Sequence, residues 1–314
     1  MNRADRIELR TVAVALLASL LLWNLPFGGV LLYPFKLLAT WLHELSHALL
    51  MVITGTGVDR VVLYRDTSGL AFSSELQGPL VRPVITAAGY MGVSLWGALL
   101  LVVTPTGRAA RIALLVLAGL LCATALLVIE PAEGDPFGPL ATAGIGAASA
   151  AVALLAPARW RVAVAHFVAA QLCVNALLDI RVLLRPTQLV GGTLAGASDA
   201  HSMASSTFGT HAPWAVWFWA ITWLLWSLVV LFVALRVSGR RALAEVAPYV
   251  RAPRPDRLDR LDRISRQRGP ARARRRARTT ASPRGGSGRG ARRRSRATGP
   301  GRTAPSGRAG TAGA

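Results

Sequence analysis

Two histidines and a glutamate with the spacing of a metal site lie in an apolar segment near the start of the chain. The run His43-Glu44-Leu45-Ser46-His47 puts the histidines four residues apart, on one face of a helix. Both imidazoles could bind one zinc ion, and Glu44 could take a proton from a water on that ion. From Val30 to Ile53 the only other ionisable side chains are Tyr33 and Lys36. Ionisable groups at membrane depth are costly and usually functional, so the pattern predicts a hydrolytic metal site in a membrane-spanning helix.

Catalytic zinc usually has three protein ligands, so a third ligand must come from elsewhere in the chain. We favour Asp179, the only acid in its apolar run, although pairing with a nearby arginine would also account for it. Asn175 lies four residues earlier on the same helix face and could hydrogen-bond the metal site or a substrate backbone. Asp199 is the alternative ligand, and it also has the character of a helix N-cap. The remaining candidates are His166, His201, His211 and the loop acids.

Charge divides the chain into an apolar body and a basic tail. Residues 237–314 contain 22 arginines and four acidic residues, whereas residues 1–236 contain 14 lysines and arginines and 11 acidic residues. Beyond Gln267 the sequence is mostly Arg, Gly, Pro, Ser and Ala, which cannot form a core. We therefore expect a membrane domain over 1–236 and a disordered Arg-rich tail over 237–314.

The body has the pattern of an all-α membrane protein with about seven transmembrane helices. A bilayer crossing needs roughly 20 apolar residues. Between the second and third segments, a β-branched run at 58–65, a turn at 66–69 and a second run at 70–74 predict a small membrane-associated β-hairpin. The segments that we expect to span are 11–32, 34–54, 83–104, 109–130, 138–156, 162–184 and 213–236.

Loop charge predicts how the chain lies in the cell membrane. The excess of arginine favours a cytoplasmic tail, which could contact anionic lipid or nucleic acid. The same rule places the basic loop 156–161 inside and the acidic loop 130–138 outside. With seven spans the N-terminus would then lie outside despite its three arginines, unless one segment is re-entrant.

Four features together resemble the site-2-protease-type family of membrane zinc metallopeptidases, especially a compact bacterial branch with little outside the membrane. They are the apolar helix with the histidine motif, the hairpin that follows it, the run Ala88-Gly89-Tyr90-Met91-Gly92, and Ser198-Asp199-Ala200 before a Trp-rich last segment. The resemblance covers about residues 30–236. In the wider family an aspartate within Asn-x-x-Pro-x-x-x-Leu-Asp-Gly is the third ligand. Here Leu178-Asp179 keeps the Leu-Asp pair and Asn175 lies upstream of it, while the proline and the glycine are absent.

The resemblance implies hydrolysis of peptide bonds in membrane proteins or peptides. His43 and His47 would hold Zn²⁺, and Glu44 would act as general base and then as general acid. The hairpin could offer a strand edge to an extended substrate. Two other functions remain open: a catalytically silent membrane scaffold or regulator of the same fold, and a transporter coupled to protons or metal ions.

Overall fold

A computed structural model describes residues 24–183, 188–195 and 198–251, together with Leu17, Leu21 and Leu22. This part of the chain is mostly helical, and five of its helices are long and apolar enough to cross a membrane. The expected count of seven spans is not confirmed. The first expected segment, 11–32, lies largely outside the described residues. The five helices are α3 (Val81–Val103), α4 (Gly107–Leu127), α5 (Phe137–Leu155), α6 (Ala158–Leu178) and the portion 213–238 of α9 (Pro213–Arg251).

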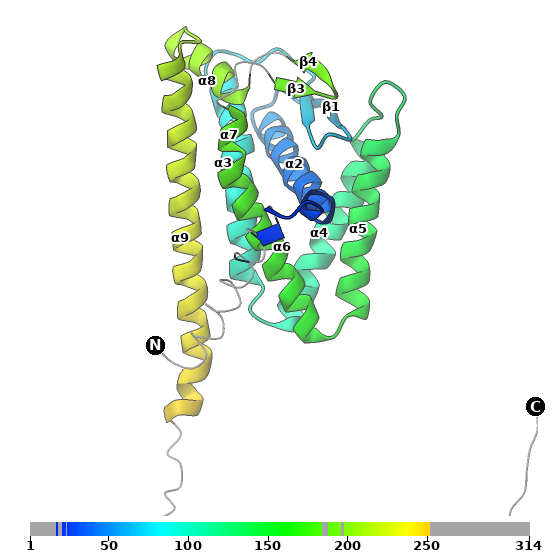
Figure 1. Cartoon of the computed structure of the whole chain (residues 1–314), viewed down its shortest axis with the longest axis vertical. Helices are drawn as coiled ribbons and strands as arrows, with labels where there is room; N and C mark the ends of the chain where they lie inside the picture. The colour runs from blue at the N-terminus through cyan, green and yellow to red at the C-terminus, as the bar shows by residue number, and fades with distance from the viewer. Residues whose placement is uncertain (1–16, 18–20, 23, 184–187, 196–197, 252–314) are drawn as a thin grey trace, which may run out of the picture. The chain divides into compact units, whose positions relative to one another are not determined.

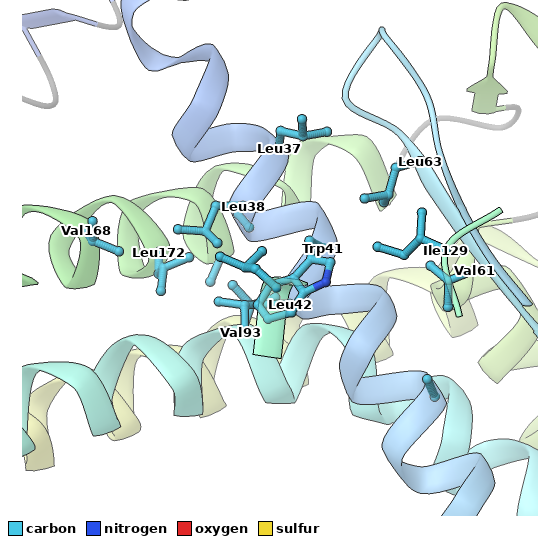
Figure 2. Packing of buried hydrophobic residues seen from close by; sticks show 14 residues of the cluster. Leu37, Leu38, Trp41, Leu42, Val61, Leu63, Val93, Ile129, Val168 and Leu172 are labelled. Carbon is cyan, nitrogen blue, oxygen red and sulfur yellow. The ribbon is translucent and has the colours of Figure 1, made fainter. Parts of the chain in front are cut away.

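Helix α2 (Gly28–Ile53) carries the histidine motif and packs against α3, α6 and a β-hairpin. It begins earlier than the segment expected at 34–54 and continues through Pro34, which lies inside the helix. Figure 2 shows its buried face, where Trp41 and Leu42 lie among apolar side chains of the neighbouring elements. The indole nitrogen of Trp41 donates to Thr124 Oγ1 on α4 at 3.0 Å. Close packing and hydrogen bonding thus hold α2 against its neighbours. Helix α2 is not one of the five candidate spans in the described part of the chain, so the expectation that the motif lies in a membrane-spanning helix is not confirmed.

The predicted hairpin is present as β1 (Val58–Leu63) and β2 (Gly69–Ser73), paired antiparallel. The other edge of β1 is occupied as well. Val61 donates its N–H to the carbonyl of Val128 and accepts from the N–H of Glu130, both at 2.9 Å. Strand β2 approaches α2 at Gly69, which lies against the side chains of Thr40 and Glu44.

The tip of the hairpin is fastened to α2 and to the α4–α5 loop. Tyr33 donates its hydroxyl to the carbonyl of Arg65 at 2.8 Å, and Thr40 donates to the carbonyl of Thr67 at 2.6 Å. Arg65 makes a bidentate pair with Asp135, with distances of 2.7 and 2.9 Å. These contacts hold the hairpin in a fixed position against the helix with the histidine motif.

A second, unexpected hairpin follows α6 and α7 (Ile180–Leu183). Its strands are β3 (Gln188–Val190) and β4 (Thr193–Ala195), joined by Gly191 and Gly192, which both have positive φ angles. The two glycine N–H groups donate to Ser68 Oγ at 3.1 Å and to Asp66 Oδ2 at 3.2 Å. Figure 1 shows the two hairpins beside each other at one end of the helices.

Helix α8 (Asp199–Phe208) comes after the second hairpin and packs on α3 and α9. Helix α9 lies along α3 and continues to Arg251, so residues 237–251, which we expected in the tail, are helical here. The rest of the expected tail, 252–314, lies outside the described residues. The sixth expected segment, 162–184, is divided between α6 and the short α7.

Candidate metal centre

Three potential metal ligands come together beside α2: His43, His47 and Asp199. Their coordinating atoms form a small triangle. The two Nε2 atoms are 3.0 Å apart, and Asp199 Oδ2 lies 3.0 Å from Nε2 of His43 and 3.3 Å from Nε2 of His47. The carboxylate comes from the first residue of α8, 156 positions along the chain from His43. The fold therefore completes a three-residue group that local sequence could only begin.

The dimensions of this triangle suit a tetrahedral ion. Zinc binds histidine nitrogen and carboxylate oxygen at about 2.0–2.2 Å, which separates neighbouring tetrahedral ligands by roughly 3.3 Å. The three observed separations are close to that value. The donor set, two imidazoles and one carboxylate, is one that catalytic zinc uses and that leaves a fourth position open.

Asp179, which we favoured as the third ligand, is not in this group. It ends α6 at the break before α7, where its N–H donates to the carbonyl of Asn175 at 2.9 Å. His43 and Lys36 lie within electrostatic range of its carboxylate. The geometry thus favours the alternative, Asp199, as the third ligand. Asp179 lies near this group and is not part of it.

Asn175 is almost fully buried on α6, at 2% exposure. Its side-chain nitrogen has no hydrogen-bond partner among the described residues. Such an amide carries an unused donor, which keeps Asn175 a candidate for substrate binding. The other sequence candidates, His166, His201 and His211, lie outside the triangle in the described part of the chain.

Helix α3 fixes one of the two histidines. Nδ1 of His47 lies 2.7 Å from the carbonyl oxygen of Ile85. A carbonyl can only accept, so Nδ1 carries the proton and the lone pair of Nε2 is free for a metal. Metal-binding histidines usually have such a partner, which sets both tautomer and ring orientation.

Gly89 on α3 faces the two histidines, and its lack of a side chain is required there. A Cβ atom at this position would lie 2.4 Å from Nε2 of His43 and 2.4 Å from Nε2 of His47. One turn later, a Cβ at Gly92 would lie 2.1 Å from Ser46 Oγ. Helix α3 packs on α2 along this glycine-containing face. The structure adds that Gly89 itself borders the candidate metal position.

Glu44 is held against the first hairpin. It is buried, at 5% exposure, and its carboxylate lies beside Ala71 on β2. A Cβ at Gly69 would lie 2.8 Å from Cγ of Glu44 and 2.9 Å from Cγ2 of Thr40, so β2 approaches α2 closely. Strand β2 therefore packs closely on the side chain of Glu44, the residue beside His43.

Asp199 is positioned by the start of α8. The N-cap is Ser198, whose side chain accepts from the N–H of His201, and Asp199 is the first helical residue. Ser198 also donates to the carbonyl of Leu183 on α7 at 3.2 Å. A carboxylate in the first helical turn is favoured by the helix dipole. The pattern Ser198-Asp199 is typical of a helix start, and Asp199 was the alternative ligand expected from the sequence.

These features define a multi-pass membrane protein with a histidine and carboxylate centre among its helices. The chain belongs to the Peptidase M50B-like family, whose model matches residues 12–234. This match confirms the resemblance to the site-2-protease type and makes the protein a membrane metallopeptidase by family. No curated protein and no solved structure matches the chain.

Proposed function

We propose that the chain is an intramembrane zinc metallopeptidase that hydrolyses peptide bonds of membrane-associated protein substrates. The observation that carries this proposal is the triangle of His43, His47 and Asp199 with Glu44 beside it. A silent scaffold would not need a buried carboxylate next to these ligands, and a transporter would not need a strand packed against it. Charged groups at such positions are retained for function because they are costly.

The chain's own residues can perform acid–base chemistry at this centre. Zn²⁺ held by the three ligands would supply Lewis acidity, lowering the pKa of water and polarising the scissile carbonyl. Glu44 accepts the proton from the attacking water and passes it to the leaving amine. The close approach of β2 at Gly69 limits the movement of the Glu44 side chain during both transfers. Asn175 offers its unpaired amide N–H to a substrate carbonyl.

The strand edge that faces the centre belongs to β2. In an antiparallel pair, two residues that lie opposite each other either both point their N–H and C=O groups toward the partner strand or both point them away from it. Val61 is opposite Ala71, and Val61 bonds the 128–130 segment on its far side. Ala71 therefore also directs its backbone groups away from β1, toward Glu44. This supports an extended substrate segment alongside β2, with its scissile bond near the ligands.

Zinc binding tests the ligand set independently of any substrate. The purified chain in detergent should retain about one zinc, as a three-ligand catalytic site requires. Structural zinc sites with four ligands bind with about 10–16 kcal/mol, or roughly 3–4 kcal/mol per ligand, so Asp199→Asn should weaken affinity by about 10²–10³-fold. Asp179→Asn is the matched control, and it should change affinity by less than about tenfold because it alters only a neighbouring charge. A larger loss in Asp179→Asn than in Asp199→Asn would refute this ligand set.

Cleavage tests the chemistry. The chain would be reconstituted in liposomes with a panel of single-span membrane proteins, and products would be followed by gel and mass spectrometry. Glu44→Gln should keep its zinc and lose cleavage, because the amide cannot accept the proton. Equal cleavage by Glu44→Gln and the wild type would refute the peptidase mechanism. Metal flux that persists in Glu44→Gln liposomes would favour the transporter.

A further inference from the structure

The two metal-binding histidines are held in different ways. His47 has the carbonyl of Ile85 as a partner for Nδ1. In the described part of the chain, His43 makes its hydrogen-bonding contacts through Nε2 alone. The χ2 angle of histidine is broad, so Nε2 needs some other contact to point steadily at a metal.

An aromatic pair supplies the missing constraint. The ring of Tyr90 meets the ring of His43 edge to face, with centroids 4.7 Å apart and planes at 88°. Tyr90 in turn stacks on Trp223 of α9, with centroids 5.2 Å apart and planes at 3°. These separations are typical of favourable aromatic contacts. The ring of Tyr90, held by Trp223, therefore restricts rotation of the His43 imidazole about χ2.

Tyr90 and Trp223 are themselves held in place by packing and by a neighbouring hydrogen bond. Trp223 is 1% exposed and belongs to a buried cluster that includes Ala200, the neighbour of Asp199, and Met203 on α8. Tyr90 packs on the same cluster. Trp226, one turn beyond Trp223, donates its indole N–H to the carbonyl of Met91 at 3.3 Å and ties α9 to α3. Rotation of Tyr90 would thus require movement of α9 or α8.

We propose that Tyr90 and Trp223 are positioning residues that orient His43 for metal binding through the aromatic stack. Helix α9 then takes part in the metal centre although it provides no ligand. The proposal rests on the proposed metal site, and it goes beyond it by assigning a role to residues of α3 and α9. The ring of Tyr90 carries this role, and its hydroxyl is dispensable for it.

Zinc affinity, measured by competition with a chelator on the purified full chain, tests this proposal without any substrate. Loss of an outer partner of a metal-binding histidine typically costs 10–100-fold in metal affinity, and we expect a loss in this range for Tyr90→Leu and for Trp223→Leu. Tyr90→Phe keeps the ring and should bind zinc within about twofold of the wild type. Trp217→Leu removes a half-exposed tryptophan from the same helix and should leave affinity unchanged.

A double-mutant comparison separates orientation of His43 from general loss of structure. Residues that act through one another are not additive, whereas independent ones are. In a His43→Ala background, Tyr90→Leu should have no further effect on zinc affinity. In a His47→Ala background, it should still lower affinity by its full factor.

Two results would overturn the proposal. One is a wild-type affinity in Tyr90→Leu, and the other is an equal loss from Tyr90→Leu in both histidine backgrounds. Failure of the wild-type chain to bind zinc would refute the metal site and the positioning role together. Zinc binding without any cleavage would contradict the proposed peptidase only, so the two proposals fail separately.

Discussion

Replacement of Gly89 by alanine should separate metal binding from folding. The added Cβ would lie 2.4 Å from Nε2 of both His43 and His47. Ordinary contacts are at about 3.5 Å, so either the rings or α3 must move by roughly 1 Å. Metal–ligand distances tolerate only about 0.2 Å. The displacement is about five times larger than the site can absorb.

The expected effects on metal binding and on the helix have opposite signs. Loss of one properly placed histidine is worth roughly 3–4 kcal/mol, so zinc affinity should fall by about 10²–10³-fold. Alanine is better than glycine inside a helix by about 1 kcal/mol, which offsets part of the local strain. Gly89→Ala should therefore remain folded, as judged by circular dichroism and thermal unfolding in detergent, while it loses zinc.

Two glycines in other spans provide matched controls. A Cβ at Gly119 on α4 or at Gly144 on α5 meets no atom within 4 Å. Gly119→Ala and Gly144→Ala should keep wild-type zinc content, measured by mass spectrometry of the metal. Wild-type zinc affinity in Gly89→Ala would refute the position that we assign to the metal.

Two further predictions concern the first hairpin. Gly69→Ala would place a Cβ 3.0 Å from Oε1 of Glu44 and displace that carboxylate. Cleavage should therefore fall at least tenfold while zinc is retained. Loss of zinc in Gly69→Ala would contradict the separate roles of Glu44 in catalysis and of the histidines in metal binding. At the hairpin tip, the hydrogen bond from Arg65 lowers the pKa of Asp135. The stability from this pair is therefore present above the ordinary carboxyl pKa of about 3.9 and is lost as the pH falls through the lower folded value. The melting temperature of Asp135→Asn should lie below that of the wild type at pH 6 and approach it at pH 3; a difference independent of pH would refute the assignment.

Local sequence was sufficient for the features that depend on near neighbours. The four-residue spacing of His43 and His47 fixes their common helix face. The run from Val58 to Ser73 contained both strands and the turn of the first hairpin. The second hairpin was missed, although Gly191-Gly192 between two short runs is a recognised hairpin signal. Its strands have only three residues each, too few for alternation to stand out.

Contacts between distant segments were decided by the tertiary structure alone. Asp179 and Asp199 were both acids in suitable surroundings, and only the packing of α8 on α3 and α9 brings Asp199 to the histidines. The role of Gly89 likewise depends on how closely α3 approaches α2. Helix periodicity predicts which side chains share a face, but it does not predict which other helix packs against that face. The sequence by itself therefore determined half of the candidate centre, the histidine and glutamate motif. The fold supplied the third candidate ligand, the strand packed against Glu44 and the aromatic pair against His43.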